Sequence, residues 1–180
     1  MNITFRKPEL KQDTDFLYAI YSEADETREF SRDLTFSTRE EFADVLQSRL
    51  KFSYYEFFVI EADGTPVGFV YGHDYAKRDL TVRFSLYICP AYRRVGIGAA
   101  AAYRYVKYLF DTLPVRKVYV TVFGCNKESL ANNLQAGFSE EAVLREYIFV
   151  GGQFVDLHYL SVTRSAFAEL CKTDVVRALL

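Results

Sequence analysis

The sequence predicts an α+β fold in which a mixed, mostly antiparallel sheet is flanked by helices. Its 180 residues are close to the usual length of one domain, so residues 1–180 are expected to form a single domain. Two β-rich runs flank the pair Asp63-Gly64, which is a strong signal for an antiparallel hairpin. A strand-like run, a glycine loop, a helical stretch and another strand-like run then follow over residues 80–123.

The first third of the chain predicts a short strand followed by two helices. Residues 2–6 suit a strand, and residues 13–22 have the periodicity of an amphipathic helix. The hydroxyl pair Ser37-Thr38, followed by glutamates in the next turn, is typical of a helix start, and apolar residues then recur at helical spacing. A second helix is therefore expected over 37–50.

The rest of the chain alternates between strand-like and helical segments. Pro90 stops one strand, four alanines favour a helix after the glycine loop, and Gly137 ends a short helix. Gly151-Gly152 suits the turn of a last hairpin. The expected strands are 55–61, 67–71, 80–89, 117–123, 141–150 and 154–162, and the expected helices are 98–113 and 126–136.

Composition argues against several classes of function. Lysine and arginine (22) nearly balance aspartate and glutamate (24), and the resulting formal net charge of -2 disfavours non-specific nucleic-acid binding. No stretch approaches the ~20 apolar residues that a membrane helix needs, and the N-terminus lacks the apolar segment of a secretory signal. We therefore expect a cytoplasmic protein that binds neither nucleic acid nor membranes.

The cysteines and histidines predict neither a disulfide framework nor a metal site. Cys89, Cys125 and Cys171 are odd in number and widely spaced. The two histidines, His73 and His158, have no Cys or His partner at metal-ligand spacing. Both are therefore expected to be ordinary surface or core residues.

The glycine loop predicts a phosphate-binding site. Gly96 and Gly98 come directly before a helix, where bare backbone N–H groups and the positive end of the helix can bind a phosphate. A purely steric need for glycine in a tight turn is an equally open explanation. Gly96, Gly98 and Ala101 also satisfy the dinucleotide pattern G-x-G-x-x-A, but the acidic residue expected about 20 positions later is missing, and no Gly-Lys-Ser/Thr follows.

The wider pattern resembles the GNAT acyltransferase family. The loop from Arg93 to Gly98 has the form R-x-x-G-x-G, follows a strand that ends at Pro90 and precedes a helix, like the acetyl-CoA loop of that family. The resemblance covers about residues 55–162. Downstream motifs similar to the ribosomal-protein N-acetyltransferase branch are Asn126 with Ser129, Gly137-Phe138, and Gly151-Gly152 with Asp156 beyond it.

The resemblance implies a CoA site with a defined set of residues. Two neighbouring parallel strands, at 82–89 and 117–123, would splay apart in a V-shape and leave backbone groups near Ile88 free for the pantetheine arm and the thioester carbonyl. Acetyl-CoA would be the co-substrate, and no metal is implied. The residues expected to contact it are Ile88, Arg93, Arg94, Val95, Gly96, Ile97, Gly98, Ala99, Asn126 and Ser129.

The predicted catalytic residues are Ser129 and Glu146. The resemblance implies that Ser129 approaches the sulfur, because Asn133 replaces a tyrosine that often protonates the departing thiolate; a contact with backbone is the alternative for an early-helix serine. An aliphatic ammonium has a pKa near ~10.4, so a base must remove its proton. Glu146 is the predicted base, with a surface role as the alternative. The strand before the loop is apolar where the family often has an acid or histidine, at Val82, Phe84 and Leu86.

Charge is unevenly distributed along the chain. Residues 75–117 contain nine basic and two acidic residues, a local charge of +7 that would attract a phosphate-rich ligand. Residues 22–46 contain eight acids and three arginines, a local charge of -5 that would attract a cationic amine. Solvated helix faces are the alternative explanation for any one of these side chains.

Two hypotheses of function follow. The first is an acetyltransferase that moves the acetyl group of acetyl-CoA to a primary amine, a protein N-terminus or a small molecule, by direct attack in a ternary complex. The alternative is a non-catalytic acyl-CoA-binding sensor or interaction module, suggested by the missing tyrosine and the apolar strand. A monomer or homodimer is expected.

Overall fold

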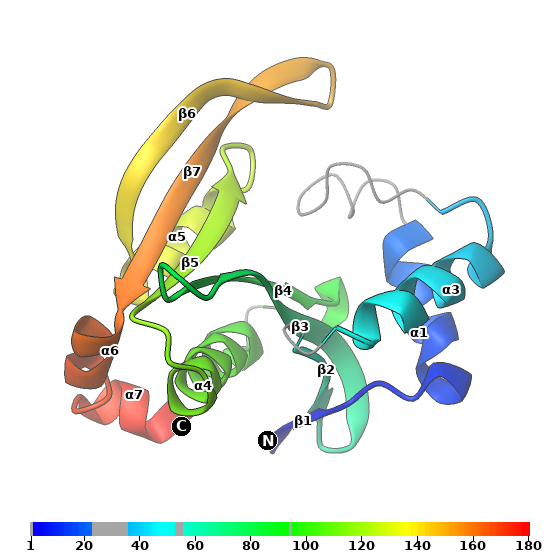
Figure 1. The fold of residues 1–180 in the computed structure, drawn as a ribbon, viewed down its shortest axis with the longest axis horizontal. Helices are drawn as coiled ribbons and strands as arrows, with labels where there is room; N and C mark the ends of the chain where they lie inside the picture. The colour runs from blue at the N-terminus through cyan, green and yellow to red at the C-terminus, as the bar shows by residue number, and fades with distance from the viewer. Residues whose placement is uncertain (1, 23–35, 53–55, 94) are drawn as a thin grey trace.

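A computed structural model describes residues 2–22, 36–52, 56–93 and 95–180 (Figure 1). Its strands are β1 (Ile3–Arg6), β2 (Phe57–Ala62), β3 (Thr65–Ala76), β4 (Thr81–Ile88), β5 (Lys117–Phe123), β6 (Ser139–Val150) and β7 (Gln153–Thr163). Its helices are α1 (Leu10–Ser22), α3 (Arg39–Leu50), the short 3-10 helix η1 (Pro90–Tyr92), α4 (Ile97–Thr112), α5 (Lys127–Gln135), α6 (Arg164–Leu170) and α7 (Asp174–Leu179). The predicted α+β class is confirmed.

The strands form one mixed sheet in the order β1-β2-β3-β4-β5-β7-β6. Every neighbouring pair is antiparallel except β4 and β5, which are parallel. That parallel pairing joins 81–83 of β4 to 117–119 of β5 and includes no later residue of either strand. Beyond it the two strands diverge (Figure 1), which confirms the predicted V-shaped splay.

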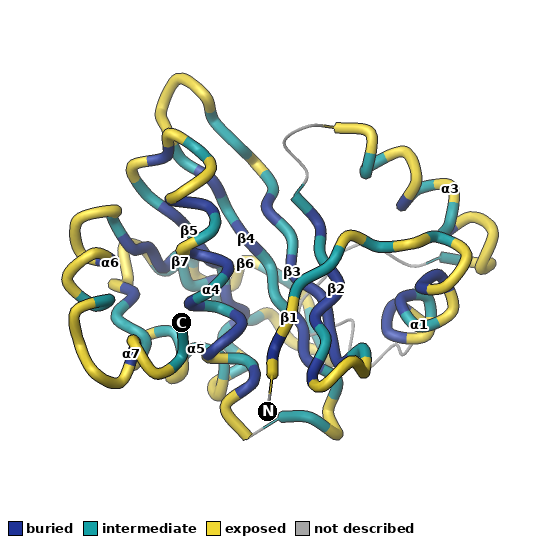
Figure 2. Tube along the Cα trace, turned by 90° about the horizontal axis from the view of Figure 1, so that it is seen from below, coloured by how far each residue is buried: buried dark blue, intermediate teal, exposed yellow. Residues whose placement is uncertain are grey.

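Alternate residues of β4 face two different hydrophobic clusters. Val82, Phe84 and Ile88 pack in the larger cluster, which includes α4, whereas Tyr87 packs in a second cluster with α1 and α3. This alternation is the two-residue period of a strand. We call the first side of the sheet the α4 face and the second the α1 face. Figure 2 shows buried stretches along β4 and α4 and a mostly exposed α3.

Local sequence signals fix two of these elements as predicted. The Thr38 side chain accepts the N–H of Glu41 at the start of α3, as the capping signature indicates. Asp63 and Gly64 both have positive φ, +49° and +82°, in the turn between β2 and β3. Positive φ at both central residues is the geometry that makes Asp-Gly favourable in a two-residue hairpin loop.

Several boundaries differ from the prediction. α1 begins at Leu10 instead of residue 13, and β6 begins at Ser139 instead of residue 141. β3 continues to Ala76 instead of ending at residue 71, because its polar end still pairs with β4 across a bulge between His73 and Ala76. α6 and α7 follow β7 in a segment for which the sequence patterns gave no prediction. Residue 55 of the strand expected at 55–61 lies outside the described residues.

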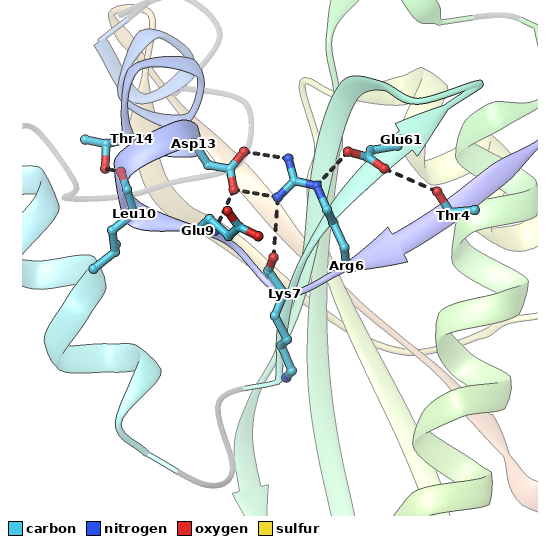
Figure 3. A network of polar contacts seen from close by, with 8 residues as sticks. All are labelled: Thr4, Arg6, Lys7, Glu9, Leu10, Asp13, Thr14 and Glu61. Atoms are coloured by element: carbon cyan, nitrogen blue, oxygen red, sulfur yellow. Dashed lines mark hydrogen bonds and ion pairs between the residues drawn. The ribbon is translucent and has the colours of Figure 1, made fainter.

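An ion-pair network fastens α1 to the sheet (Figure 3). The Arg6 guanidinium donates to the two carboxylate oxygens of Asp13 at 2.6 and 2.7 Å and to Glu61 at 2.6 Å. The Asp13 side chain is 2% exposed and also accepts the backbone N–H of Glu9. Burial alone would raise the pKa of Asp13, but the hydrogen bonds from Arg6 and Glu9 outweigh it and lower that pKa below its usual value.

The β6–β7 hairpin extends beyond the rest of the sheet (Figure 1). β6 is the edge strand and contains no buried residue. Asp156 accepts the N–H of Glu146 at 2.9 Å and pairs with Arg145 at 3.0 Å, which pins a bulge in β6. Farther along the hairpin, Phe149 and Phe154 contact each other in a T-shaped geometry, and both are more than half exposed.

Candidate active site

The gap between β4 and β5 exposes backbone groups of β4. The N–H of Cys89 donates to the carbonyl of Val67 on β3 at 2.8 Å. Because successive N–H groups of a strand point in opposite directions, those of Leu86 and Ile88 point away from β3. No described residue of β5 pairs with β4 at this level. Two backbone N–H donors of β4 therefore face the open V.

The glycine loop leads directly into α4. Gly96 has a φ of +85° and is the N-cap of this 16-residue helix. Its carbonyl accepts the N–H of Ala100 at 3.1 Å. The N–H groups of Ile97, Gly98 and Ala99 precede that first helical bond, so they point out of the helix start. Together with the helix dipole, these three donors form a site suited to an anion.

The structure separates the two explanations for the glycines. The left-handed backbone at Gly96 favours glycine for conformational reasons alone. Among the described residues, a Cβ at Gly98 would contact just one atom, Ile88 Cγ1, at an ordinary 3.8 Å. Packing within the chain therefore does not require glycine at position 98, and the space beside it is available to a ligand.

The Arg93 side chain turns back onto β4. Its Nε donates to the carbonyl of Ile88 at 2.9 Å, and its guanidinium lies over the Tyr87 ring, 5.4 Å from the ring centre. Arg93 therefore holds the loop against the end of β4. It also occupies the Ile88 carbonyl. The N–H is therefore the backbone group of Ile88 that is left to bind a ligand in the gap.

The other predicted loop residues differ in what they offer a ligand. Val95 is 60% exposed and Ala99 is also exposed, so both can contact a bound molecule with their side chains. The Ile97 side chain is 1% exposed and belongs to the core, which leaves its backbone N–H for binding. Arg94 lies outside the described residues.

The start of α5 follows β5 directly, across the gap from β4. Asn126 Oδ1 accepts the N–H of Ser129 at 3.0 Å, so Asn126 is the N-cap of α5. Asn133 Nδ2 donates to the Ser129 carbonyl at 2.8 Å and to Ser129 Oγ at 3.3 Å. Because this donor occupies a lone pair of the hydroxyl, the hydroxyl proton is available to another acceptor. The structure thus brings Asn126 and Ser129 together and gives Asn133 a supporting contact.

Glu146, the predicted base, lies in the bulge of β6. Its backbone has a φ of +50° and its N–H donates to Asp156. The residue is exposed, and the described residues include no partner for its carboxylate. Its role as a base stays a prediction, since no neighbouring group is seen to direct its carboxylate toward the gap.

The α1 face of β3 and β4 has a polar row that the sequence analysis did not single out. In the strand register His73 lies opposite Arg83, and Tyr71 lies opposite Ser85. His73 contacts Ser85 with one ring nitrogen and Asp74 with the other, both at 3.2 Å. The available signal was the alternation of aromatic residues at 69 and 71 with His73, which predicts one shared face.

A cavity of about 390 Å³ opens beside this row. Its charged side chains are paired, Asp74 with Arg83 at 3.1 Å and Glu141 with Lys117. The Arg83 guanidinium lies 5.3 Å from the centre of the Tyr159 ring, and its Nε has no hydrogen-bond partner among the described residues. The cavity is lined by Asp74, Thr81, Val82, Arg83, Tyr119, Glu141, Ala142 and Tyr159.

The basic residues of segment 75–117 are largely engaged with neighbours. Arg104 donates to the carbonyls of Ile3 and Leu179, and Lys107 pairs with Asp111 at 2.5 Å. Their positive charge is therefore partly compensated where they lie. Most of the acidic segment 22–46 lies outside the described residues.

The described part of the chain shows neither a metal site nor a membrane helix. None of its His, Cys, Asp and Glu side chains gather in a group of three that could hold a metal ion. None of its helices combines the length and the apolar character needed to cross a membrane. The three cysteines are free thiols.

Comparisons with known proteins connect these features to one family. The model of the acetyltransferase (GNAT) family matches residues 16–138, more than half of the chain. The SPbeta prophage-derived uncharacterized N-acetyltransferase YokL of Bacillus subtilis (strain 168) is 26% identical over 122 residues, which are 68% of this chain and 69% of that protein. The putative ribosomal N-acetyltransferase YdaF of the same organism is 26% identical over 102 residues, 57% of this chain and 56% of that protein.

Solved structures share the fold at low sequence identity. The spermidine N-acetyltransferase from Vibrio cholerae, in complex with CoA and spermine, superimposes with a TM-score of 0.86 and 20% identity, over 92% of this chain and 98% of that chain. A structure described as a probable acetyltransferase superimposes with a TM-score of 0.76 and 23% identity, over 91% and 93% of the two chains. The chain therefore belongs to the acetyltransferase (GNAT) family and is an acetyl-CoA-dependent N-acetyltransferase.

Proposed function

We propose that residues 1–180 act as one domain that transfers the acetyl group of acetyl-CoA to a primary amine by direct attack within a ternary complex. The strongest support is the meeting of the open edge of β4 with the start of α4. A Cβ placed at Gly98 would lie 3.8 Å from Ile88 Cγ1, so the start of α4 lies beside the end of β4. In acetyl-CoA a pantetheine arm joins the thioester to a pyrophosphate. A binding site for it therefore needs hydrogen-bond donors at both groups.

In this proposal the pyrophosphate lies at the start of α4. The N–H groups of Ile97, Gly98 and Ala99 donate to it, and the absent side chain at position 98 leaves it room. Val95 and, by family resemblance, Arg94 add side-chain contacts. Arg93 supports binding indirectly, because its bond to the Ile88 carbonyl holds the loop against β4.

The gap-facing N–H groups of Leu86 and Ile88 would then serve the thioester. As the amine attacks, negative charge develops on the thioester oxygen, and donors fixed in the strand stabilise that charge without reorganising. The sulfur leaves as a thiolate, and a thiol with a pKa of about 8.5 is a good leaving group. Ser129 would donate its hydroxyl proton toward the sulfur, while Asn133 holds the hydroxyl oxygen.

Two classes of acceptor have support. The Vibrio cholerae structure is a complex with CoA and spermine, which favours a small polyamine. One Bacillus subtilis relative is named a putative ribosomal N-acetyltransferase, which favours a protein N-terminus. We also propose a monomer or homodimer for this chain, although the Vibrio cholerae protein has been seen as a dodecamer. Light scattering of the purified chain distinguishes these assemblies.

An amine panel tests the proposed function. Release of free thiol from acetyl-CoA is measured with spermidine, spermine, a peptide with a free N-terminus, and a ribosomal extract, and mass spectrometry identifies the acetylated product. The expected result is one acceptor that raises thiol release well above hydrolysis by water. Tight acetyl-CoA binding without transfer to any of these amines would contradict the proposal and favour the non-catalytic acyl-CoA sensor.

A further inference from the structure

Asp74, His73 and Ser85 form a continuous chain of polar contacts on the α1 face of the sheet. Asp74 Oδ2 lies 3.2 Å from His73 Nδ1, and His73 Nε2 lies 3.2 Å from Ser85 Oγ. The Asp74 side chain is 59% exposed and that of His73 is 25% exposed. The chain of contacts therefore runs from solvent at Asp74 to the interior of β4 at Ser85.

The contacts fix where the protons lie. An ionised carboxylate can accept but not donate, so the imidazole nitrogen facing Asp74 carries the proton. The other nitrogen of a neutral imidazole is then a lone pair, and it faces the hydroxyl of Ser85. In this tautomer the Ser85 hydroxyl can donate its proton to His73 Nε2, and the tautomer is assigned from the partners of the two nitrogens.

A strained turn of the backbone brings the carboxylate to the histidine. Asp74 has a φ of +51° at the bulge where the β3–β4 register shifts between His73 and Ala76. Left-handed backbone is unfavourable for a residue with a side chain, although aspartate tolerates it better than most. Arg83 also pairs with Asp74 at 3.1 Å, which holds the carboxylate in place.

Ser85 lies where the two central strands separate. Arg83 is the last residue of β4 that pairs with β5, and Ser85 is the next residue on the same face. Leu86, whose N–H points into the gap, follows directly. A hydroxyl on the α1 face thus lies one residue from a backbone donor that the proposed function assigns to the thioester.

We propose that Ser85 and His73 form a proton relay that deprotonates the attacking amine, with Asp74 as a positioning residue. The proposal rests on the proposed function, because it needs an amine acceptor beside the gap. In this proposal the base is His73 on β3, the strand paired with β4, and not Glu146 on β6.

The relay balances every proton of the reaction. The acceptor ammonium gives one proton to Ser85 Oγ as the original Ser85 proton moves to His73 Nε2, and the free amine attacks the thioester carbon. When the carbon–sulfur bond breaks, the second proton on the attacking nitrogen goes to the thiolate, with Ser129 as the nearby donor. His73 then releases its proton to solvent, so the products are the amide, CoA thiol and one proton.

The surroundings of His73 keep its imidazole neutral before the reaction, so that it can accept a proton. Burial lowers the pKa of His73 below its usual 6.5, and this effect outweighs the opposing charge of Asp74. The other charged groups that face the ring are Arg83 on β4 and Arg49 on α3, and both also lower the pKa. Tyr71, which bonds to Ser85, is held in its neutral form because burial raises its pKa. Activity from this relay should be present at neutral pH and be lost as the pH falls through the pKa of His73.

Ring-nitrogen NMR of His73 tests the relay in the free protein, without an acceptor. The chain contains two histidines, and His158→Gln leaves His73 as the single imidazole to be assigned. The expected spectrum shows the Nδ1–H tautomer at neutral pH, with Nε2 shifted in Ser85→Ala and protonation below pH 6.5. An Nε2–H tautomer, or a ring already protonated at pH 7, would overturn the proposal.

A pH profile of acetyl transfer tests the same relay in turnover. The probe is spermidine, or the amine from the panel that the wild-type chain acetylates fastest. His73→Gln keeps a hydrogen-bonding side chain but cannot take a proton, and Ser85→Ala removes the link. At pH 7 each should lower kcat/KM by about 10²- to 10⁴-fold, the usual size of a general-base contribution. The loss should shrink about tenfold per pH unit toward the amine pKa near ~10.4, because the amine then loses its proton to water.

Matched variants distinguish the relay from a structural role. His158→Gln is the control, because His158 also contacts a carboxylate, that of Glu140, at 2.6 Å. His158 lies on β7 opposite Val122 of β5, and Val122 packs on the α4 face, so His158 lies on the face away from the relay. It should keep wild-type kcat/KM. A uniform loss in His73→Gln at every pH would indicate a structural role and contradict the relay, and wild-type activity in His73→Gln would do the same. If no amine is acetylated, the proposed function fails and the relay fails with it; if an amine is acetylated but the NMR shows the other tautomer, the relay alone fails.

Discussion

The two faces of β4 differ sharply where the strand leaves β5. On the α4 face, Val82 and Phe84 are 1% and 3% exposed and belong to the core. On the α1 face, Arg83 and Ser85 contact polar side chains of β3. The apolar positions of β4 offer no base, because those side chains pack in the core. The proposed proton relay lies on the other face and takes its histidine from the neighbouring strand, β3.

This difference divides the work of the site between two layers. The open edge of β4 and the start of α4 offer backbone donors and space for a phosphate-rich ligand. In the proposed relay, the α1 face supplies the side chains that move a proton, Ser85 and His73. Each layer can therefore be disturbed separately.

The largest effect on stability is expected from breaking the contact that holds α1 on its face. Arg6→Ala leaves the buried Asp13 carboxylate without its guanidinium, and loss of one partner of a buried pair costs about 3 kcal/mol or more. Lys7→Ala is the control, because Lys7 is 58% exposed in its pair with Glu56 and should cost less than about 1 kcal/mol. Urea denaturation measures both, and equal effects would contradict the account.

Acid should reproduce part of this loss. The pKa of Asp13 is lowered in the folded chain, so its contribution to stability is present above the unfolded pKa and is lost as the pH falls through the folded value. As the pH falls below the unfolded pKa of an aspartate, ~3.9, the melting temperature of the wild-type chain should therefore fall more steeply than that of Arg6→Ala. Parallel curves would show that the pair does not titrate with folding.

The next effect concerns the start of α4 and leaves the α1 face unchanged. Gly98→Val places a branched side chain where the pyrophosphate is proposed to lie, and should weaken CoA binding by about 10- to 100-fold, the cost of one or two charge-assisted hydrogen bonds. Gly98→Ala should weaken it less. Because a Cβ at Gly98 meets open space apart from Ile88, the melting temperature should change little. Calorimetry that finds normal CoA affinity in Gly98→Val would remove the pyrophosphate from this loop.

The last effects concern the start of α5. Ser129→Ala should lower kcat and kcat/KM together by about 10- to 100-fold while leaving acetyl-CoA affinity nearly unchanged, because the hydroxyl is needed as the thiolate forms. Asn133→Ala removes the donor that orients the hydroxyl and should cost less than about tenfold. Ser165→Ala, at the start of α6, is a matched control. Wild-type kcat in Ser129→Ala, with both substrates saturating, would leave Ser129 as an ordinary helix-start residue.

The sequence predicted the features that depend on local pattern. Glycines before an alanine-rich stretch predicted the loop and α4, and the Asp63-Gly64 pair predicted the β2–β3 hairpin. The glycine pattern could not distinguish a steric need from a ligand site. The backbone angle at Gly96 and the open space at Gly98 are properties of the folded chain.

Other features depend on contacts between distant segments and left no local trace. Arg93 is predicted to contact CoA, and no local pattern indicates that its Nε binds the Ile88 carbonyl at the end of β4. His73 appeared isolated because its partner Ser85 is twelve residues away and the bulge at Asp74 has no pattern of its own. The extension of β3 to Ala76 was missed because its end is polar, and pairing with β4 maintains it.

Backbone hydrogen exchange along β4 tests most directly the claim that acetyl-CoA binds in the gap between β4 and β5. The N–H groups of Leu86 and Ile88 face the gap, while that of Cys89 is already bonded to Val67 on β3 and serves as the internal control. Saturating acetyl-CoA should slow exchange at Leu86 and Ile88, and at Gly98 and its neighbours, with little change at Cys89. Calorimetric binding without protection at Leu86 and Ile88 would contradict the account.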